Sequence, residues 1–88
     1  SHQNAVSWNA LLSGYDEHGC SEEALKCFDQ MQAEGVAPHA ATFVCTIKAC
    51  GSIGLINKGQ EIHVQVIARG YEEETFIGNT LVDFYAKC

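Results

Sequence analysis

A repeat of constant spacing limits what this chain can fold into more than any other feature. Segment 6–12 (Val-Ser-Trp-Asn-Ala-Leu-Leu) is followed 35 residues later by segment 41–47 (Ala-Thr-Phe-Val-Cys-Thr-Ile), and after the same interval by segment 76–82 (Phe-Ile-Gly-Asn-Thr-Leu-Val). The offset needs no gap, and it also relates Gly19 to Gly54. A constant period of this length is typical of stacked-repeat proteins, in which each unit packs against its neighbours.

Each unit shows the apolar spacing of two amphipathic helices with glycine between them. We predict helices over residues 7–18, from Ser21 to Gly35, and over 41–50, 55–69 and 75–87. Ser21 and Thr42 are expected to cap helix N-termini, and segment 51–54 is expected to form a turn. Pro38 excludes continuation of the helix that precedes it.

The same apolar stripes predict a core between the stacked helices. Its expected members are Trp8, Leu11, Leu12, Tyr15, Ala24, Leu25, Phe28, Met31, Phe43, Ile47, Cys50, Ile56, Ile62, Val66, Ile67, Phe76, Leu81, Val82 and Tyr85. Small residues at equivalent points of both units, Gly14 with Ala49 and Ala24 with Gly59, predict close helix contacts. The predicted fold is an all-α, right-handed α-solenoid of helix-turn-helix repeats. Its units are 5–39, 40–74 and, as the first helix of a third, 75–88.

The charge balance argues against general affinity for nucleic acid, because the formal net charge is −6. The basic residues Lys26, Lys48, Lys58, Arg69 and Lys87 are scattered, whereas electrostatic binding of phosphate needs clustered Lys and Arg. The 5 cysteines include no Cys-x-x-Cys pair, which favours reduced, packed thiols over a disulfide framework or a zinc site. No apolar run approaches the ~18 residues that a transmembrane helix needs.

The sequence contains no catalytic arrangement. It lacks the His-x-Glu with Cys-x-x-Cys of zinc-dependent base deaminases, and it lacks a glycine-rich phosphate loop and a nucleophile elbow. We therefore predict a segment that is not an enzyme and that binds no cofactor, metal or small-molecule substrate. Because the chain opens on Ser-His and stops within the pattern, we expect a piece of a longer solenoid. Any targeting sequence or editing domain would then lie elsewhere in the parent protein.

Three stretches resemble a known family. Val-Ser-Trp-Asn-Ala-Leu-Leu, then Glu-Glu-Ala-Leu-x-x-Phe-x-x-Met and Gly-Val-x-Pro, resemble the pentatricopeptide repeat of plant organellar RNA-binding proteins. Ala-Thr-Phe-Val-x-x-Ile-Lys-Ala-Cys resembles the long motif of that family, and Phe-Ile-Gly-Asn-Thr-Leu-Val-Asp-Phe-Tyr-Ala-Lys-Cys the opening of its short motif. The P, L, S order is similar to the subclass associated with cytidine-to-uridine editing. The resemblance implies a mitochondrial or chloroplast protein that binds single-stranded RNA at about one base per repeat, with accessory editing factors as further partners.

In that family the fifth and last residues of each motif read a base, and the second residues of successive motifs hold it between them. The resemblance assigns base reading to Asn9, His39, Val44, Glu74 and Asn79, and base sandwiching to Val6, Ala41 and Phe76. An Asn amide has both a donor and an acceptor, so it can pair with the edge of a pyrimidine. Valine has neither, which predicts poor discrimination in the second unit. His39 stands where the family prefers Asp or Asn, so the pyrimidine preference expected of the first unit is weak.

Other interpretations stay open at this point. Asn9 and Asn79 are also compatible with local capping at helix starts. A protein-binding tetratricopeptide module has a similar period of about 34 residues, although its own Trp-Leu-Gly-Tyr pattern does not include the Gly-Val-x-Pro ending found here. The long motif could instead serve as a docking surface for an accessory editing factor.

Overall fold

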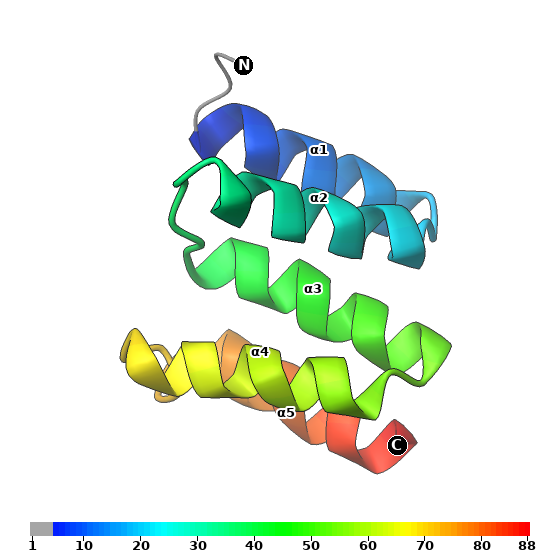
Figure 1. Ribbon diagram of the computed structural model, residues 1–88. Coiled ribbons are helices and arrows are strands. Elements are labelled where there is room, and N and C mark those ends of the chain that lie inside the picture. The colour runs from blue at the N-terminus through cyan, green and yellow to red at the C-terminus, as the bar shows by residue number, and fades with distance from the viewer. Residues whose placement is uncertain (1–4) are drawn as a thin grey trace.

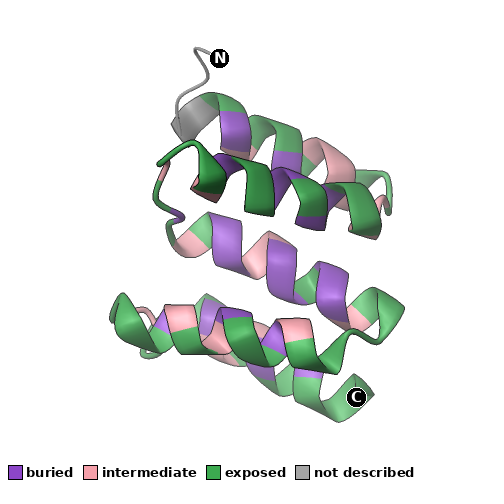
Figure 2. Cartoon of the chain, in the orientation of Figure 1, coloured by how far each residue is buried: buried purple, intermediate pink, exposed green. Residues whose placement is uncertain are grey.

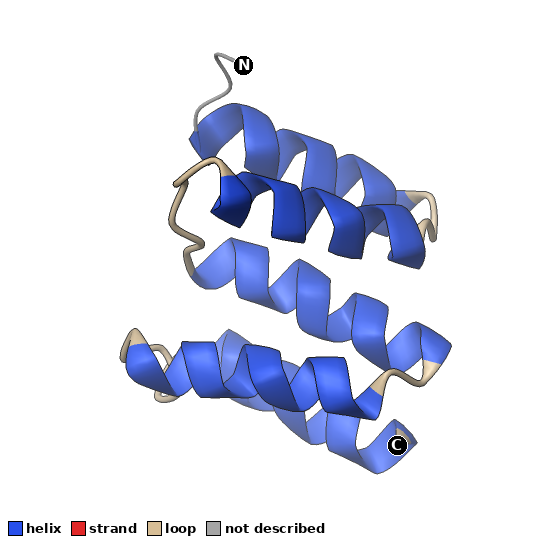
Figure 3. Cartoon of the chain, in the orientation of Figure 1, coloured by secondary structure: helices blue, strands red, loops and turns tan. Residues whose placement is uncertain are grey.

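Five helices make up most of the described chain. The computed structural model describes residues 5–88, with side chains from Ser7 onward, and that part contains no strand (Figure 3). The helices are α1 Ala5–Glu17, α2 Ser21–Ala33, α3 Ala40–Ile53, α4 Ile56–Ala68 and α5 Thr75–Lys87. The starts of α1, α3 and α5 keep the 35-residue interval, and so do those of α2 and α4. The all-α fold of helix-turn-helix repeats is therefore confirmed. Within residues 5–88, none of the helices combines the length and apolarity needed to cross a bilayer.

The helices stack in two layers. α1, α3 and α5 are successive neighbours in one layer, and α2 and α4, in front of it in Figure 1, form the other. α3 lies at the centre and packs against all four other helices. The wall formed by α1, α3 and α5 therefore presents the starts of three equivalent helices side by side.

Glycines in the left-handed region end the first four helices, as the sequence predicts. Gly19 has a φ of 68° and Gly54 a φ of 70°, a conformation that only glycine adopts at little cost. The N–H of Cys20, which follows Gly19, donates to the Tyr15 carbonyl at 2.8 Å, and the equivalent bond after Gly54 measures 3.0 Å. The two helix-turn-helix units thus share one turn geometry.

The N-caps predicted at Ser21 and Thr42 are both wrong, because each residue lies within its helix instead of preceding it. α2 begins at Ser21 itself and its N-cap is Cys20, because the Cys20 carbonyl already accepts the first helical bond, from the N–H of Ala24 at 3.0 Å. α3 follows the N-cap His39, so Thr42 lies inside its first turn. There the Thr42 hydroxyl accepts the backbone N–H of His39 at 3.2 Å, which satisfies a donor at the helix start.

Of the close helix contacts predicted at small residues, the one at Gly59 is confirmed and the one at Gly14 is wrong. A Cβ at Gly59 would lie 2.0 Å from Phe84 Cζ, so the predicted close contact is confirmed. The same expectation for Gly14 is wrong, because a Cβ there would meet nothing within 4 Å. α3 also continues through Gly51 to Ile53, which makes the turn shorter than predicted.

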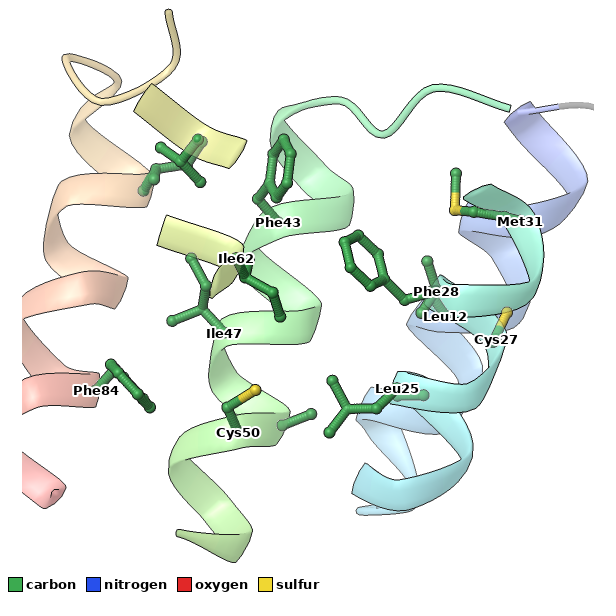
Figure 4. Close-up of a cluster of buried hydrophobic side chains, with 14 of the residues drawn as sticks. Leu12, Leu25, Cys27, Phe28, Met31, Phe43, Ile47, Cys50, Ile62 and Phe84 are labelled. Atoms are coloured by element: carbon green, nitrogen blue, oxygen red, sulfur yellow. The ribbon is translucent and has the colours of Figure 1, made fainter. Parts of the chain in front are cut away.

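Side chains from all five helices form one core (Figure 4). Phe28 of α2 and Phe43 of α3 are fully buried, and their rings meet edge to face with centroids 6.2 Å apart. The central helix α3 carries a large share of buried positions (Figure 2). His63 of α4 contacts the next repeat, with its Nδ1 2.8 Å from the Tyr85 hydroxyl of α5.

Several residues predicted to be buried are exposed. They are Leu11, Ile56, Ile67, Phe76, Val82 and Tyr85, and Phe76 is the most exposed at 81%. On α5 the prediction is confirmed for Leu81, which forms the core face of this helix together with Ile77 and Phe84. For the residues of α5 the reason is the number of neighbouring helices: α3 has described helices on both sides, whereas α5 packs only against α3 and α4.

Candidate nucleic-acid interface

The reading pair assigned to the first repeat is brought together near the starts of α1 and α3. Asn9 Nδ2 lies 2.7 Å from His39 Nε2, although 30 residues separate them in the sequence. Asn9 Oδ1 accepts a hydrogen bond from the Thr42 hydroxyl at 2.5 Å. Asn9 is half-buried and His39 is exposed, so the pair lies at the surface of the wall. Local capping alone does not account for these contacts, because they join residues 30 and 33 positions apart, and the Thr42 bond links the first repeat to the second.

Three further assigned residues line one apolar hollow between α3 and α5. Ala41, Val44 and Phe76 form it together with Ala40 and Cys45, and its volume is about 380 Å³. The ring of Phe76 and the methyl group of Ala41 belong to neighbouring helices, and Val44 lies one turn along α3 from Ala41. Aromatic and small apolar side chains can hold a nucleobase by stacking and dispersion. The hollow is therefore chemically suited to a base and unsuited to a phosphate.

Of the remaining assigned residues, Glu74 and Asn79 belong neither to the contact between Asn9 and His39 nor to the hollow. Glu74 is exposed and is the N-cap of α5, without a side-chain hydrogen bond to the helix. Asn79 is exposed on α5, about one turn after Phe76. The side chain of Val6 lies outside the described residues. The structure thus places Glu74 and Asn79 on the surface of the same wall.

Ion pairs reduce the charge available for phosphate. Lys48 Nζ of α3 lies 3.1 Å from Asp16 Oδ2 of α1, and Lys58 Nζ of α4 lies 2.8 Å from Asp29 Oδ1 of α2. Each pair links two repeats at the surface, where such pairs contribute roughly 0–1 kcal/mol. With a net charge of −6 as well, the chain as a whole repels a polyanion.

The thiols of the described chain are unpaired, as the cysteine pattern predicts. Cys27 and Cys50 are buried, Cys20 and Cys45 are half-buried, and Cys88 is exposed. Burial raises the pKa of Cys50 to about 11 and also raises the pKa of Cys27 and of Cys45. These three thiols therefore stay protonated and unreactive at neutral pH. Among residues 5–88, no three His, Cys, Asp or Glu side chains converge as metal ligands do.

The repeat spacing and the residues of the wall agree with comparisons against known proteins. A sequence model of the PPR repeat family, the pentatricopeptide repeats, matches residues 3–52, which is more than half of the chain. The chain belongs to the PPR repeat family. This membership favours the pentatricopeptide interpretation over the tetratricopeptide alternative.

Similar pentatricopeptide repeat-containing proteins occur in Arabidopsis thaliana. One is 41% identical over 86 residues, covering 98% of this chain and 10% of the relative. Another, named chloroplastic, is 42% identical over 82 residues, covering 93% of this chain and 16% of the relative. A third, named mitochondrial, is 35% identical over 86 residues, covering 98% of this chain and 8% of the relative. The chain thus spans a small part of these proteins, and the organelles in the names of the second and third agree with the expected location.

Thr42 is the residue of this interface that the PPR motif pattern does not reveal. From the sequence it is expected only to cap a helix, yet its hydroxyl contacts Asn9, 33 residues earlier. In the sequence, Thr42 is recognisable only as the third residue of the second unit. Its contact with Asn9 becomes apparent only when the stacking of the two units is known.

Proposed function

We propose that this chain is a single-stranded RNA-binding module of a longer PPR array that targets organellar transcripts. The observation that carries the proposal is the apolar hollow at the surface of the helical wall. Ala41 and Phe76, assigned as successive sandwiching residues, both line it, and so does the reading residue Val44. A base inserted there stacks on the Phe76 ring and contacts Ala41, with its edge toward Val44. Because valine neither donates nor accepts a hydrogen bond, this position accepts any base.

Discrimination comes from the first repeat. The Asn9 amide, held against His39 and Thr42, offers a donor and an acceptor to a base edge at the wall surface. A pyrimidine is preferred there, weakly. With units at 5–39, 40–74 and 75–88, the chain covers about two or three nucleotides, at one base per repeat. The full array supplies the basic surface that this chain lacks.

The order of motifs supports the editing-associated subclass of the family. The first unit carries the Gly-Val-x-Pro ending, the second the long pattern, and the third the opening of the short pattern. In this proposal the chain selects the transcript and contributes no chemistry. The deamination of cytidine to uridine takes place in another domain or another protein.

The decisive experiment for the hollow is an NMR titration of the 15N-labelled chain with short RNA oligonucleotides, which detects weak binding in a protein of 9.6 kDa. Phe76→Ala is expected to weaken binding about five-fold to a hundred-fold, because stacking contributes ~1–3 kcal/mol per base. Val64→Ala is the matched control, since Val64 is an exposed apolar residue of α4, in the other layer. Equal affinity of the two variants would show that the hollow holds no base.

A second titration tests base reading. Oligonucleotides that differ at one position are compared on the unmodified chain and on Asn9→Ala, whose preference for a pyrimidine should disappear. An unchanged preference would show that Asn9 is not a reading residue. Docking of a protein partner is separated by pull-down from plant organelle extract with RNase treatment: an association that survives RNase and the Phe76→Ala change argues for protein docking instead.

A further inference from the structure

Thr42 is a buried hydroxyl placed at the centre of the first reading pair. Its side chain is 0% exposed. The oxygen accepts the backbone N–H of His39 at 3.2 Å and donates its hydrogen to Asn9 Oδ1 at 2.5 Å. Thr42 therefore contacts both assigned reading residues of the first repeat, although it belongs to the first helix of the second.

These bonds determine which way the Asn9 amide faces. A hydroxyl has one hydrogen, and of the two ends of an amide only the oxygen accepts it. The bond from Thr42 therefore places Oδ1 on the α3 side and directs Nδ2 toward His39 Nε2, 2.7 Å away. A rotation of the amide by half a turn would exchange donor and acceptor, and with them the base edge that Asn9 matches.

The second repeat provides an internal comparison. Its reading residue is Val44, which has no amide to orient, and the position equivalent to Thr42 is Ile77, 0% exposed and unable to hydrogen-bond. The hydroxyl is thus present where the reading residue is an amide and absent where the reading residue is apolar.

We propose that Thr42 is a positioning residue for base specificity: it holds the Asn9 amide in one orientation, so that the preference of one repeat depends on the third residue of the next. This inference rests on the proposed RNA-binding function and deepens it. It also has a part that needs no RNA, namely the fixed orientation of the Asn9 side chain in the free chain.

The first test compares Thr42→Val, which keeps the shape and removes the hydroxyl, with Thr42→Ser, which keeps the hydroxyl. In the free chain, NMR should show cross-peaks from the Asn9 Nδ2 hydrogens to the His39 ring in the unmodified chain and in Thr42→Ser, and their loss in Thr42→Val. Retained cross-peaks in Thr42→Val would overturn the proposal. Thermal unfolding of each variant separates this readout from a general loss of structure.

The second test measures base preference on the same variants. Thr42→Val should lower the ratio of affinities between matched and mismatched oligonucleotides by about three-fold to ten-fold. This factor corresponds to the entropy cost of ordering one side chain, that of Asn9, on binding. Affinity for the hollow lined by Phe76 should stay unchanged, and Thr42→Ser should restore the ratio. A fall in affinity for all oligonucleotides alike would indicate a structural role only and would overturn the positioning role.

The third test transfers the arrangement to the second repeat, so that it does not depend on the folding of Thr42→Val. Val44→Asn is compared with the double variant Val44→Asn/Ile77→Thr. A base preference at the second position should arise only in the double variant, and equal preference in both would refute the inference. If no oligonucleotide shifts any resonance of the unmodified chain, the proposed function fails, while the cross-peaks of the free chain still decide the orientation of Asn9.

Discussion

The contact between Gly59 and Phe84 leads to the sharpest stability prediction. Replacing a helical glycine with alanine normally stabilises a protein by up to ~1 kcal/mol, because alanine is the better helix former. At Gly59 the added Cβ would lie 2.0 Å from Cζ of the Phe84 ring and 2.5 Å from Cε1. Carbon atoms in contact prefer roughly 3.5–4.0 Å, so the ring must retreat by about 1.5 Å.

The ring can retreat only by disturbing its present packing, because Phe84 is 2% exposed. Overpacking of this kind costs about 1–3 kcal/mol, which exceeds the helix-propensity gain. We therefore expect Gly59→Ala to lower the free energy of unfolding by about 1–2 kcal/mol, or the melting temperature by roughly 4–15 °C for a chain of this size.

Gly14→Ala is the matched control, because a Cβ at Gly14 would meet nothing within 4 Å. It should raise the free energy of unfolding by up to ~1 kcal/mol, through helix propensity alone. Both variants are measured by urea and thermal unfolding followed by circular dichroism. The double variant Gly59→Ala/Phe84→Leu should be less unstable than the sum of its single changes. A rise in stability for Gly59→Ala equal to that of Gly14→Ala would refute the packing argument.

Three further predictions concern titration, hydrogen bonding and salt. Folding raises the Cys50 pKa from 9.0 to about 11, so its contribution to stability is complete below pH 9 and is lost as pH rises toward 11. At pH 10 the loss in the free energy of unfolding is about 1.4 kcal/mol. Cys50→Ala should lack this part of the pH dependence when unfolding in urea is measured. An identical dependence of the unfolding free energy on pH in the unmodified chain and in Cys50→Ala would contradict the prediction. Thr46→Val should change the unfolding free energy by less than about 1 kcal/mol, because the Thr46 hydroxyl bonds only carbonyls of its own helix; a larger loss in thermal unfolding would show a role across the repeat. RNA affinity should fall with salt at a slope shallower than about −2 on logarithmic axes, as for at most three phosphate contacts on a single strand; a steeper slope would show that phosphates, not bases, dominate binding.

Local features of the fold follow from the sequence because they depend on residues close together in the chain. The five helices are recognisable from apolar spacing, and their ends at Gly19 and Gly54 follow from the left-handed conformation that glycine adopts. The 35-residue offset carries this local pattern from unit to unit, so the starts of equivalent helices keep it. The candidate base-binding residues of the hollow, Ala41 and Phe76, also follow from motif position, and the structure brings them together.

Burial and the contacts between repeats were decided by the tertiary structure. Phe43 and Ile47 are buried on α3, yet their stripe is exposed at Val82 on α5, because only α3 has described helices on both sides. The sequence pattern is the same in each unit, but the solvent exposure of a side chain depends on which other helices pack against its own. The bond between Thr42 and Asn9 has the same origin: each residue has an ordinary local explanation, and only the stacking of α3 on α1 makes them partners.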